Sequence, residues 1–365
     1  MDRRRFLTAA GAVPIVSQFP LNAIAQTRSF TPMPGEWRTF ETVTRVDVAS
    51  PAGLTQVWIP VPQINNEWQT SEPSTWTTNA AQARLATDAS SGAQMVHAVF
   101  ADSEKTPWLE VTSRVRTQDR TEDWSRKDPN VERERLAMYL QPTELMPIDG
   151  IVLKTARDVT GNRRSDFDKA QAIYDWIVMN TYREPKVRGC GVGDIKAMLE
   201  TGNMGGKCGD INALFVGLSR ASRVPARDLY GIRVAPSKFG YKELGAGSAD
   251  ISRAQHCRAE VWLAGHGWVA MDPADVGKVM RLETAEWLKT TSHPVVAPVN
   301  KALFGGWEGN WMAYNDAHDV ALPGSKGARL GFFMYPAAET RGERIDSLDP
   351  DTFKYKITVR EIKGA

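Results

Sequence analysis

The chain has little of several features that would assign it to a special class of protein. It holds only three cysteines, and no pair of them shows the close Cys-x-x-Cys spacing typical of zinc sites. No low-complexity tract or internal repeat interrupts its 365 residues, and no stretch approaches the ~20 apolar residues of a transmembrane helix. The sequence therefore predicts a globular protein, long enough for two ordinary domains, with no membrane span in its mature part.

A surplus of charge of one sign is also missing. Lysine and arginine number 45 against 43 aspartates and glutamates, which gives a formal net charge of +2. Arg3, Arg4 and Arg5 against Asp2 account for that charge, so the rest of the chain is near neutral. A near-neutral chain without a basic sequence cluster gives no electrostatic reason to expect nucleic acid as a partner. No acidic loop with calcium-binding spacing is present either, and we expect no metal or other cofactor.

Residues 1–25 are typical of an export signal. Arg3-Arg4-Arg5-Phe6-Leu7 carries the Arg-Arg-x-Phe-Leu core of a twin-arginine signal. A mildly apolar stretch follows and ends at Ala23-Ile24-Ala25, a small-x-small cleavage site. We expect a periplasmic protein exported by the twin-arginine pathway.

Strand signals dominate the first third of the chain, after an extended leader over residues 26–39. Alternating or β-branched runs predict strands over 40–48, 55–60, 94–100 and 108–116, and the segment 63–92 between them is rich in loop formers. We expect an antiparallel β domain over residues 40–118, built as a sandwich. The charged stretch 119–135 is typical of a solvated segment, within a linker over 119–150.

The pattern changes to helices near residue 147. Apolar spacing predicts helices over 151–159, 166–182 and 193–200, then a fourth that begins at Cys208 and ends before Pro225. Only strand signals follow, over 226–234, 255–263, 268–272, 311–315, 330–335 and 353–362. Helices followed by an antiparallel sheet predict an α+β domain over residues 151–365, with the Cys208 helix packed on the sheet.

Cys208 has the surroundings of a reactive thiol. It lies on a glycine-rich turn at the start of a helix, where the partial positive charge favours a thiolate. Gly205, Gly206 and Gly209 leave backbone room for a substrate and for N–H groups that would face an oxyanion. Asp210 favours the helix N-terminus by its charge. A cysteine before a helical stripe is, taken alone, more often a packing residue.

An imidazole and a carboxylate follow in the order that acyl transfer needs. His256 is the only one of the five histidines within a strand expected beside the Cys208 helix, and Asp272 ends the next strand. The two side chains share a face only if paired residue numbers sum to an even value. A three-residue loop over 264–266, which pairs Leu263 with Gly267, satisfies this condition. We therefore predict an odd-length loop or a bulge in this hairpin.

The remaining cysteines leave two alternatives. In an oxidising compartment the economical prediction is a disulfide between Cys190 and Cys257, with Cys208 left unpaired. Strand alternation would point Cys257 away from His256 and out of the reactive cluster. Two buried free thiols are the other alternative.

These features resemble the transglutaminase-like superfamily of papain-fold cysteine enzymes, in its bacterial exported branch. The resemblance covers roughly residues 166–276, and Val57-Trp58-Ile59-Pro60-Val61-Pro62 resembles the β domain of bacterial members. Its motifs are Gly206-Lys207-Cys208-Gly209-Asp210, Pro225-Ala226-Arg227, His256 at the head of a strand, and Gly267-Trp268 leading to Asp272-Pro273.

By this resemblance Cys208 is the nucleophile, His256 the general base and acid, and Asp272 the residue that orients the imidazole. Papain relatives carry an oxyanion-binding glutamine six residues before the cysteine, where this chain has Gly202. Asn203 is the candidate side-chain donor in its place, beside the backbone N–H of Cys208.

The expected function is an exported cysteine acyl-transfer enzyme acting on amide or peptide carbonyls. Water would resolve the thioester in a peptidase or amidase, and the abundance of water favours this outcome. An amine would resolve it in a protein-glutamine transglutaminase. The alternative from another class is a non-catalytic module that binds a peptide or a cell-envelope partner. Its aromatic contacts would come from Trp307, Trp311, Tyr314, Phe332, Phe333 and Tyr335, although core packing is the more common role for such residues.

Overall fold

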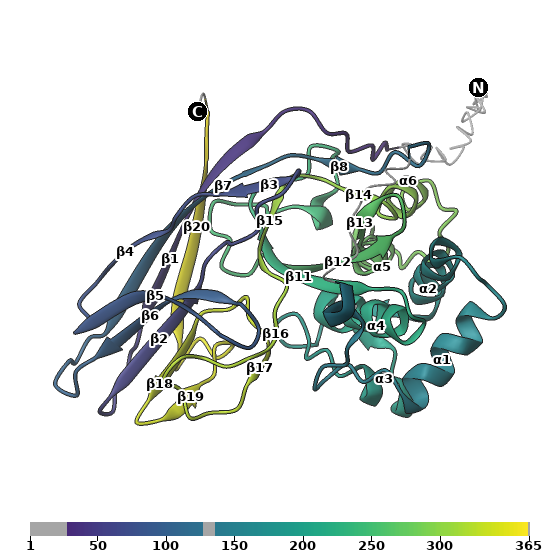
Figure 1. Ribbon diagram of the computed structural model, residues 1–365. Helices are drawn as coiled ribbons and strands as arrows, with labels where there is room; N and C mark the ends of the chain where they lie inside the picture. Colours follow the sequence, from purple (N-terminus) through teal and green to yellow (C-terminus); the bar gives the residue numbers. More distant parts are fainter. Residues whose placement is uncertain (1–27, 127–135, 364–365) are drawn as a thin grey trace, which may run out of the picture.

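The computed structural model describes residues 28–126 and 136–363 and divides into a β-rich unit and a mixed unit (Figure 1). The predicted twin-arginine signal lies outside the described residues. Within them, no helix has the length and apolar character needed to cross a membrane.

The β-rich unit consists of two antiparallel five-stranded sheets. One has the order β20-β1-β7-β3, with β4 also pairing β7, and the other has the order β19-β18-β2-β6-β5. Val46, Val57, Phe100 and Val111 from both sheets share one buried apolar cluster, so the predicted sandwich is confirmed. The strands are β1 (Arg38–Asp47), β2 (Thr55–Pro60), β3 (Gln69–Ser71), β4 (Thr75–Thr78), β5 (Gln82–Thr87), β6 (Gln94–Phe100), β7 (Trp108–Thr117), β18 (Ala337–Thr340), β19 (Glu343–Ile345) and β20 (Lys354–Ile362).

Three C-terminal strands belong to this sandwich, which corrects the predicted domain boundaries. β20 pairs with β1 along its length, from Thr39 opposite Ile362 to Asp47 opposite Lys354. β18 pairs with β2, and β19 extends the same sheet. The predicted 151–365 domain included these strands, because pairing between strands far apart in the sequence leaves no local signal. The segment 63–92, expected as loop, contains β3, β4 and β5.

The mixed unit confirms the predicted α+β class. Its four-stranded sheet has the order β13-β12-β11-β15, with β11 (Ala226–Arg233), β12 (Gln255–Leu263), β13 (Gly267–Met271) and β15 (Trp311–Asn315). The preceding helices are α1 (Gly150–Thr160), α2 (Asp166–Asn180), α3 (Ile195–Thr201) and α4 (Cys208–Ala221). All residues of α4 are buried, and the helix packs against β11 and β12 (Figure 1). The central position of α4 places Cys208 at the meeting point of helices and sheet.

The prediction that only strands follow α4 is wrong. Helix α5 (Pro273–Leu282) begins directly after β13, and α6 (Ala297–Ala302) follows it. Asp272 caps α5, since its side chain accepts a hydrogen bond from the N–H of Asp275 at 3.2 Å, and Pro273 occupies the first turn. An aspartate followed by proline is a local helix-start signal, and Asp272-Pro273 carries it.

The segment 119–150 is more than a solvated linker. Strand β8 (Arg120–Thr121) pairs with β14 (Gly306–Trp307), and the buried Arg120 forms an ion pair with Glu260 of β12. The leader before β1 also packs on the mixed unit, where the ring of Phe30 lies 5.0 Å from that of Phe239. Shorter elements are η1 (Leu136–Leu140), β9 (Tyr182–Arg183), β10 (Gly205–Gly206), η2 (Lys242–Leu244), β16 (His318–Val320) and β17 (Leu330–Phe332).

Candidate active site

Cys208 is the first residue of α4 and is 3% exposed. The glycines around it serve close backbone packing, which corrects the expectation that they leave room for a substrate. A Cβ on Gly209 would lie 2.8 Å from the carbonyl oxygen of Cys190, which accepts the Gly209 N–H. A Cβ on Gly205 would meet the ring of Tyr182, at 2.6 Å. Among the described residues the N–H of Cys208 itself has no acceptor, as expected for the first residue of a helix.

Asp210 stabilises the start of α4 by hydrogen bonds as well as by charge. Its carboxylate accepts the N–H of Lys207 at 2.9 Å, which closes the first turn of the helix. It also accepts the N–H groups of Val192 and Gly193, at 2.8 and 2.9 Å. One buried carboxylate thus fixes both the Cys208 turn and the loop that carries Cys190.

The β12–β13 hairpin brings His256 and Asp272 together. Leu263 pairs with Gly267 around a three-residue loop, as the predicted register requires. Asp272 lies one residue beyond β13, and its Oδ2 is 2.8 Å from Nε2 of His256. Both side chains are buried, so water competes little for this contact. Because Nε2 is engaged, Nδ1 is the ring nitrogen left for another partner.

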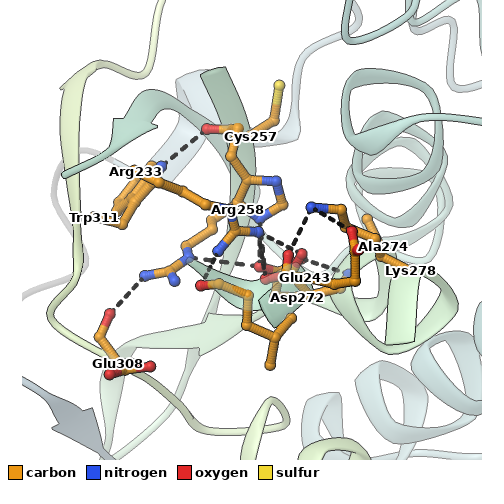
Figure 2. Close-up of polar contacts among 12 residues, drawn as sticks. Arg233, Glu243, Cys257, Arg258, Asp272, Ala274, Lys278, Glu308 and Trp311 are labelled. Atoms are coloured by element: carbon orange, nitrogen blue, oxygen red, sulfur yellow. Dashed lines mark hydrogen bonds and ion pairs between the residues drawn. The ribbon is translucent and has the colours of Figure 1, made fainter. Parts of the chain in front are cut away.

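Two buried residues that the sequence analysis missed hold Asp272 in place. Asn212, one turn after Cys208 on α4, donates to Oδ1 of Asp272 at 3.2 Å and to the carbonyl of Cys257 at 2.8 Å. The Nε of Arg258 lies 3.5 Å from Oδ2 of Asp272. Figure 2 shows the guanidinium of Arg258 reaching from Asp272 to Glu308, whose carbonyl it contacts at 3.2 Å. An asparagine within the apolar helix was the available signal for Asn212.

A second carboxylate also faces the imidazole. Oδ2 of Asp275 lies 3.4 Å from Nε2 of His256, and Nη2 of Arg233 binds both oxygens of Asp275 at 2.6 and 2.8 Å. Burial raises the pKa of Asp275, but the Arg233 guanidinium outweighs it and holds the pKa low. His256 therefore faces a second carboxylate, in addition to Asp272, whose ionised form Arg233 stabilises.

The electrostatics of the site favour an ion pair between Cys208 and His256. Burial and Arg233 lower the pKa of His256, but Asp275 and Asp272 outweigh them, and the pKa is raised above its usual value. The neighbouring thiols of Cys190 and Cys257, together with His256, hold the pKa of the Cys208 thiol well below its usual value, against the effect of burial. A raised imidazole pKa and a lowered thiol pKa describe a thiolate–imidazolium pair.

The three cysteines meet, although they are far apart in the sequence. The sulfurs of Cys190, Cys208 and Cys257 lie within 4.8 Å of one another, and all three are free buried thiols. The predicted Cys190–Cys257 disulfide is therefore absent, and the expectation that Cys257 lies out of reach of Cys208 is wrong. Cys257 lies within β12, opposite Tyr230 of β11. Because α4 packs against β12, Cys257 comes close to Cys208 at the start of that helix.

Two groups of side chains have the composition to hold a metal ion. One is the three thiols, and the other is His256 with Asp272 and Asp275, whose candidate ligand atoms also lie within 4.8 Å of one another. Both groups contain a member of the candidate catalytic set, so an ion at either would compete with the chemistry of Cys208 or of His256.

A cavity of about 260 Å³ opens over Cys208 and His256. Gln255, Gly245 and Lys278 are among the other residues that line it. Asn203, the candidate oxyanion donor, is exposed, is not among the residues that line this cavity, and uses its Oδ1 to accept the N–H of Gly205 at 3.3 Å. The unpaired N–H of Cys208 is the better placed of the two predicted donors.

Comparisons with known proteins agree with this architecture. Residues 153–273, which contain Cys208, His256 and Asp272, match the sequence model of the transglutaminase-like superfamily. An uncharacterised protein of Haemophilus influenzae is 36% identical over 326 residues, which cover 85% of this chain and 87% of that protein.

Among similar solved structures, one shares the overall fold and another is similar only in part. A candidate cysteine protease from Cytophaga hutchinsonii has a TM-score of 0.55 at 15% identity, over 92% of this chain and 94% of that one. The periplasmic domain of TgpA from Pseudomonas aeruginosa has a TM-score of 0.35 at 13% identity, over 76% and 98% of the two chains. The chain belongs to the transglutaminase-like superfamily, and its α+β core is a cysteine-enzyme fold.

Proposed function

We propose that this protein is an exported cysteine acyl-transfer enzyme that hydrolyses amide or peptide bonds. The observation that carries the proposal is the 2.8 Å contact between His256 and Asp272, on the sheet against which α4 places Cys208. In this proposal Cys208 is the nucleophile, His256 the general base and acid, and Asp272 the residue that orients the ring.

The chemistry proceeds by two acyl transfers. The Cys208 thiolate attacks the carbonyl carbon, and the N–H of Cys208 donates to the oxyanion. Protonated His256 gives its proton to the leaving amine as the C–N bond breaks, which leaves a thioester on Cys208. His256 then removes a proton from water, the hydroxide attacks the thioester, and a carboxylic acid leaves as the thiol is restored.

Hydrolysis is favoured over cross-linking because water is far more abundant than any amine in an aqueous compartment. A protein-glutamine transglutaminase would use the same first step and differ only in the acceptor. Of the aromatic residues considered for a binding module, Trp307, Trp311, Tyr314 and Phe333 are buried in the core. Phe332 and Tyr335 are half-buried, so few aromatic side chains remain for a partner to contact. A pure binder also has no use for buried carboxylates at His256, which are costly to desolvate.

Cleavage of a peptide library by the mature protein, from residue 26 onward, tests the proposal. New peptide termini detected by mass spectrometry are expected with the natural protein and not with Cys208→Ala. A Lys105→Gln variant, altered at an exposed loop of the sandwich, should cleave normally. The proposal fails if the natural protein and Cys208→Ala give the same product pattern over the whole library, with and without added primary amines.

A further inference from the structure

A second cavity adjoins the one over Cys208 and His256. It has a volume of about 470 Å³ and is bordered by Cys190 and Lys207. Both cavities include Arg183, Arg253 and Gln255 in their walls, so they adjoin, and the first of them contains the Cys208 thiol in its lining. We call the two adjoining cavities together the basic groove.

Positive side chains dominate the walls of the basic groove. Of the side chains that line the second cavity, five are cationic and none is a carboxylate: Arg183, Arg188, Lys207, Arg253 and Lys354. The first cavity adds Arg233 and Lys278, with Asp250 as its one acid.

Some of these charges are already neutralised by the protein. Arg188 pairs with Asp346 at 2.9 Å, Arg233 with Asp275, and Lys278 with Glu243 at 3.4 Å. By contrast, Arg183, Lys207, Arg253 and Lys354 form no ion pair with any residue that the structure describes. Among the described residues, four cations without an ion-pair partner therefore remain in the walls of the basic groove.

The fold fixes three of these cations next to the site. Arg183 lies on β9 directly beside Gly206 of β10, two residues before Cys208. Lys207 immediately precedes Cys208, and Arg253 precedes His256 by three residues. The Nε of Arg183 is buried and has no hydrogen-bond partner within the described residues. Burial and the nearby Arg183 lower the pKa of Lys207. The fold therefore keeps two cations, Lys207 and Arg183, close enough to repel each other.

We propose that the basic groove binds the carboxylate side chains of an acidic peptide segment, with Asp or Glu close to the bond that Cys208 attacks. This inference rests on the proposed function, because the groove borders the thiol used on an acyl group. A bound carboxylate would supply the missing acceptor of Arg183 and neutralise Lys207 and Arg253. Because the mature chain is near neutral as a whole, the groove is a local feature and not part of a generally basic surface.

Binding can be measured without catalysis, in mature protein that carries Cys208→Ala. The probes are three fluorescent peptides of equal length that differ only in having Glu, Gln or Lys at the same alternating positions. Fluorescence anisotropy should show tightest binding of the Glu peptide, which weakens between about 0.05 M and 0.5 M ionic strength as screening increases. Adding Arg183→Gln and Arg253→Gln together should weaken it about 10-fold or more.

The matched control is Lys105→Gln, which removes an exposed cation in the loop between β6 and β7 and should leave binding unchanged. Arg253→Gln alone is the second variant in case the double variant does not fold, since Arg253 is exposed. Equal binding of the three peptides, or preference for the Lys peptide, overturns the proposal. Tighter binding of a single-stranded DNA of the same charge would also overturn it, in favour of a nucleic-acid groove.

A chemical probe separates this inference from the proposed function. Iodoacetate is an anion and iodoacetamide is neutral, and both alkylate Cys208 of the natural protein without any substrate. The rate of alkylation by iodoacetate divided by the rate with iodoacetamide should be higher for Cys208 than for a free thiol in solution. This ratio should fall about 10-fold in the Arg183→Gln/Arg253→Gln variant. Cleavage of Gln peptides as fast as Glu peptides would refute the groove and leave the enzyme standing. Binding of Glu peptides with no cleavage of any peptide would refute the enzyme and leave the groove standing.

Discussion

The side chain of Asn212 donates a hydrogen bond to Oδ1 of Asp272 at 3.2 Å. Asn212 lies one helical turn after Cys208, so the helix that carries the candidate nucleophile also holds the candidate orienting carboxylate. The Oδ1 of Asn212 accepts the N–H of Ala274 at 3.3 Å, which ties α4 to the start of α5 as well. A single buried amide therefore couples the positions of three elements at the site.

Replacement of Asn212 by alanine should weaken both folding and reactivity. It leaves the carbonyl of Cys257 and the N–H of Ala274 without a partner in the core, which should cost about 1–3 kcal/mol of unfolding free energy. Urea denaturation measures this loss, and Asn180→Ala, at an exposed helix end, should change stability little. Unchanged stability of Asn212→Ala would show that the amide does not join these elements.

The two neighbouring thiols should control the ionisation of Cys208. Cys190→Ala or Cys257→Ala removes a thiol that lies within 4.8 Å of the Cys208 sulfur and lowers its pKa, so the pKa of Cys208 should rise toward its usual value. His256→Ala should act in the same direction. The rate of iodoacetamide alkylation, measured from pH 5 to 9, reports this pKa. A pH profile that does not move in any of the three variants would contradict the thiolate–imidazolium pair.

The protein should contain three free thiols. Titration with a thiol reagent in denaturant, without reductant, should detect Cys190, Cys208 and Cys257 in each chain. The Cys190→Ser variant serves as the control and should give two. Detection of one thiol in the natural protein would instead restore the disulfide between Cys190 and Cys257.

Asp228 should make the stability depend on pH. It is buried, and burial raises its pKa to about 7, with Arg220 acting in the opposite direction. Its folded-state pKa lies above the unfolded value near 3.9, so stability is lost as pH rises from about 4 through about 7. Asp228→Asn should therefore match the natural protein at pH 4 and exceed it by about 2–4 kcal/mol at pH 8.

Urea unfolding at both pH values measures the effect, and Asp158→Asn, at an exposed position on α1, is the control. His318, whose Nε2 lies 3.5 Å from Asp228, stays neutral over this range because burial lowers its pKa to about 3. A stability gain that is equal at pH 4 and pH 8 would rule out ionisation of Asp228 as its cause.

Export should depend on the paired arginines near the N-terminus. Replacing Arg3 and Arg4 by lysine keeps the charge but removes the Arg-Arg pattern that the twin-arginine pathway reads. We expect the natural protein in the periplasmic fraction and the variant as a longer, cytoplasmic precursor. Mature-length variant in the periplasm would point to a different export route.

The sequence was sufficient wherever a local pattern carried the information. The apolar stripe after Cys208 predicted α4, alternation predicted β12 over residues 255–263, and the Leu263–Gly267 pairing followed from the need to place His256 and Asp272 on one face. One prediction failed although its signal was also local. Asp272-Pro273 is a helix-start signal as well as part of the family motif, and the expectation of strands alone after α4 left out the helix α5 that begins there.

The amino-acid sequence by itself determined the periodicities, the helix starts and the hairpin register, because these depend on neighbours within a few residues. Only the tertiary structure decided which distant residues meet. It placed the sulfurs of Cys190 and Cys257 beside that of Cys208, Asn212 against Asp272, and β20 along β1. It also gathered Arg183, Lys207 and Arg253 into one groove of a near-neutral chain. Such contacts arise when whole elements pack to bury apolar surface, and no local spacing records them.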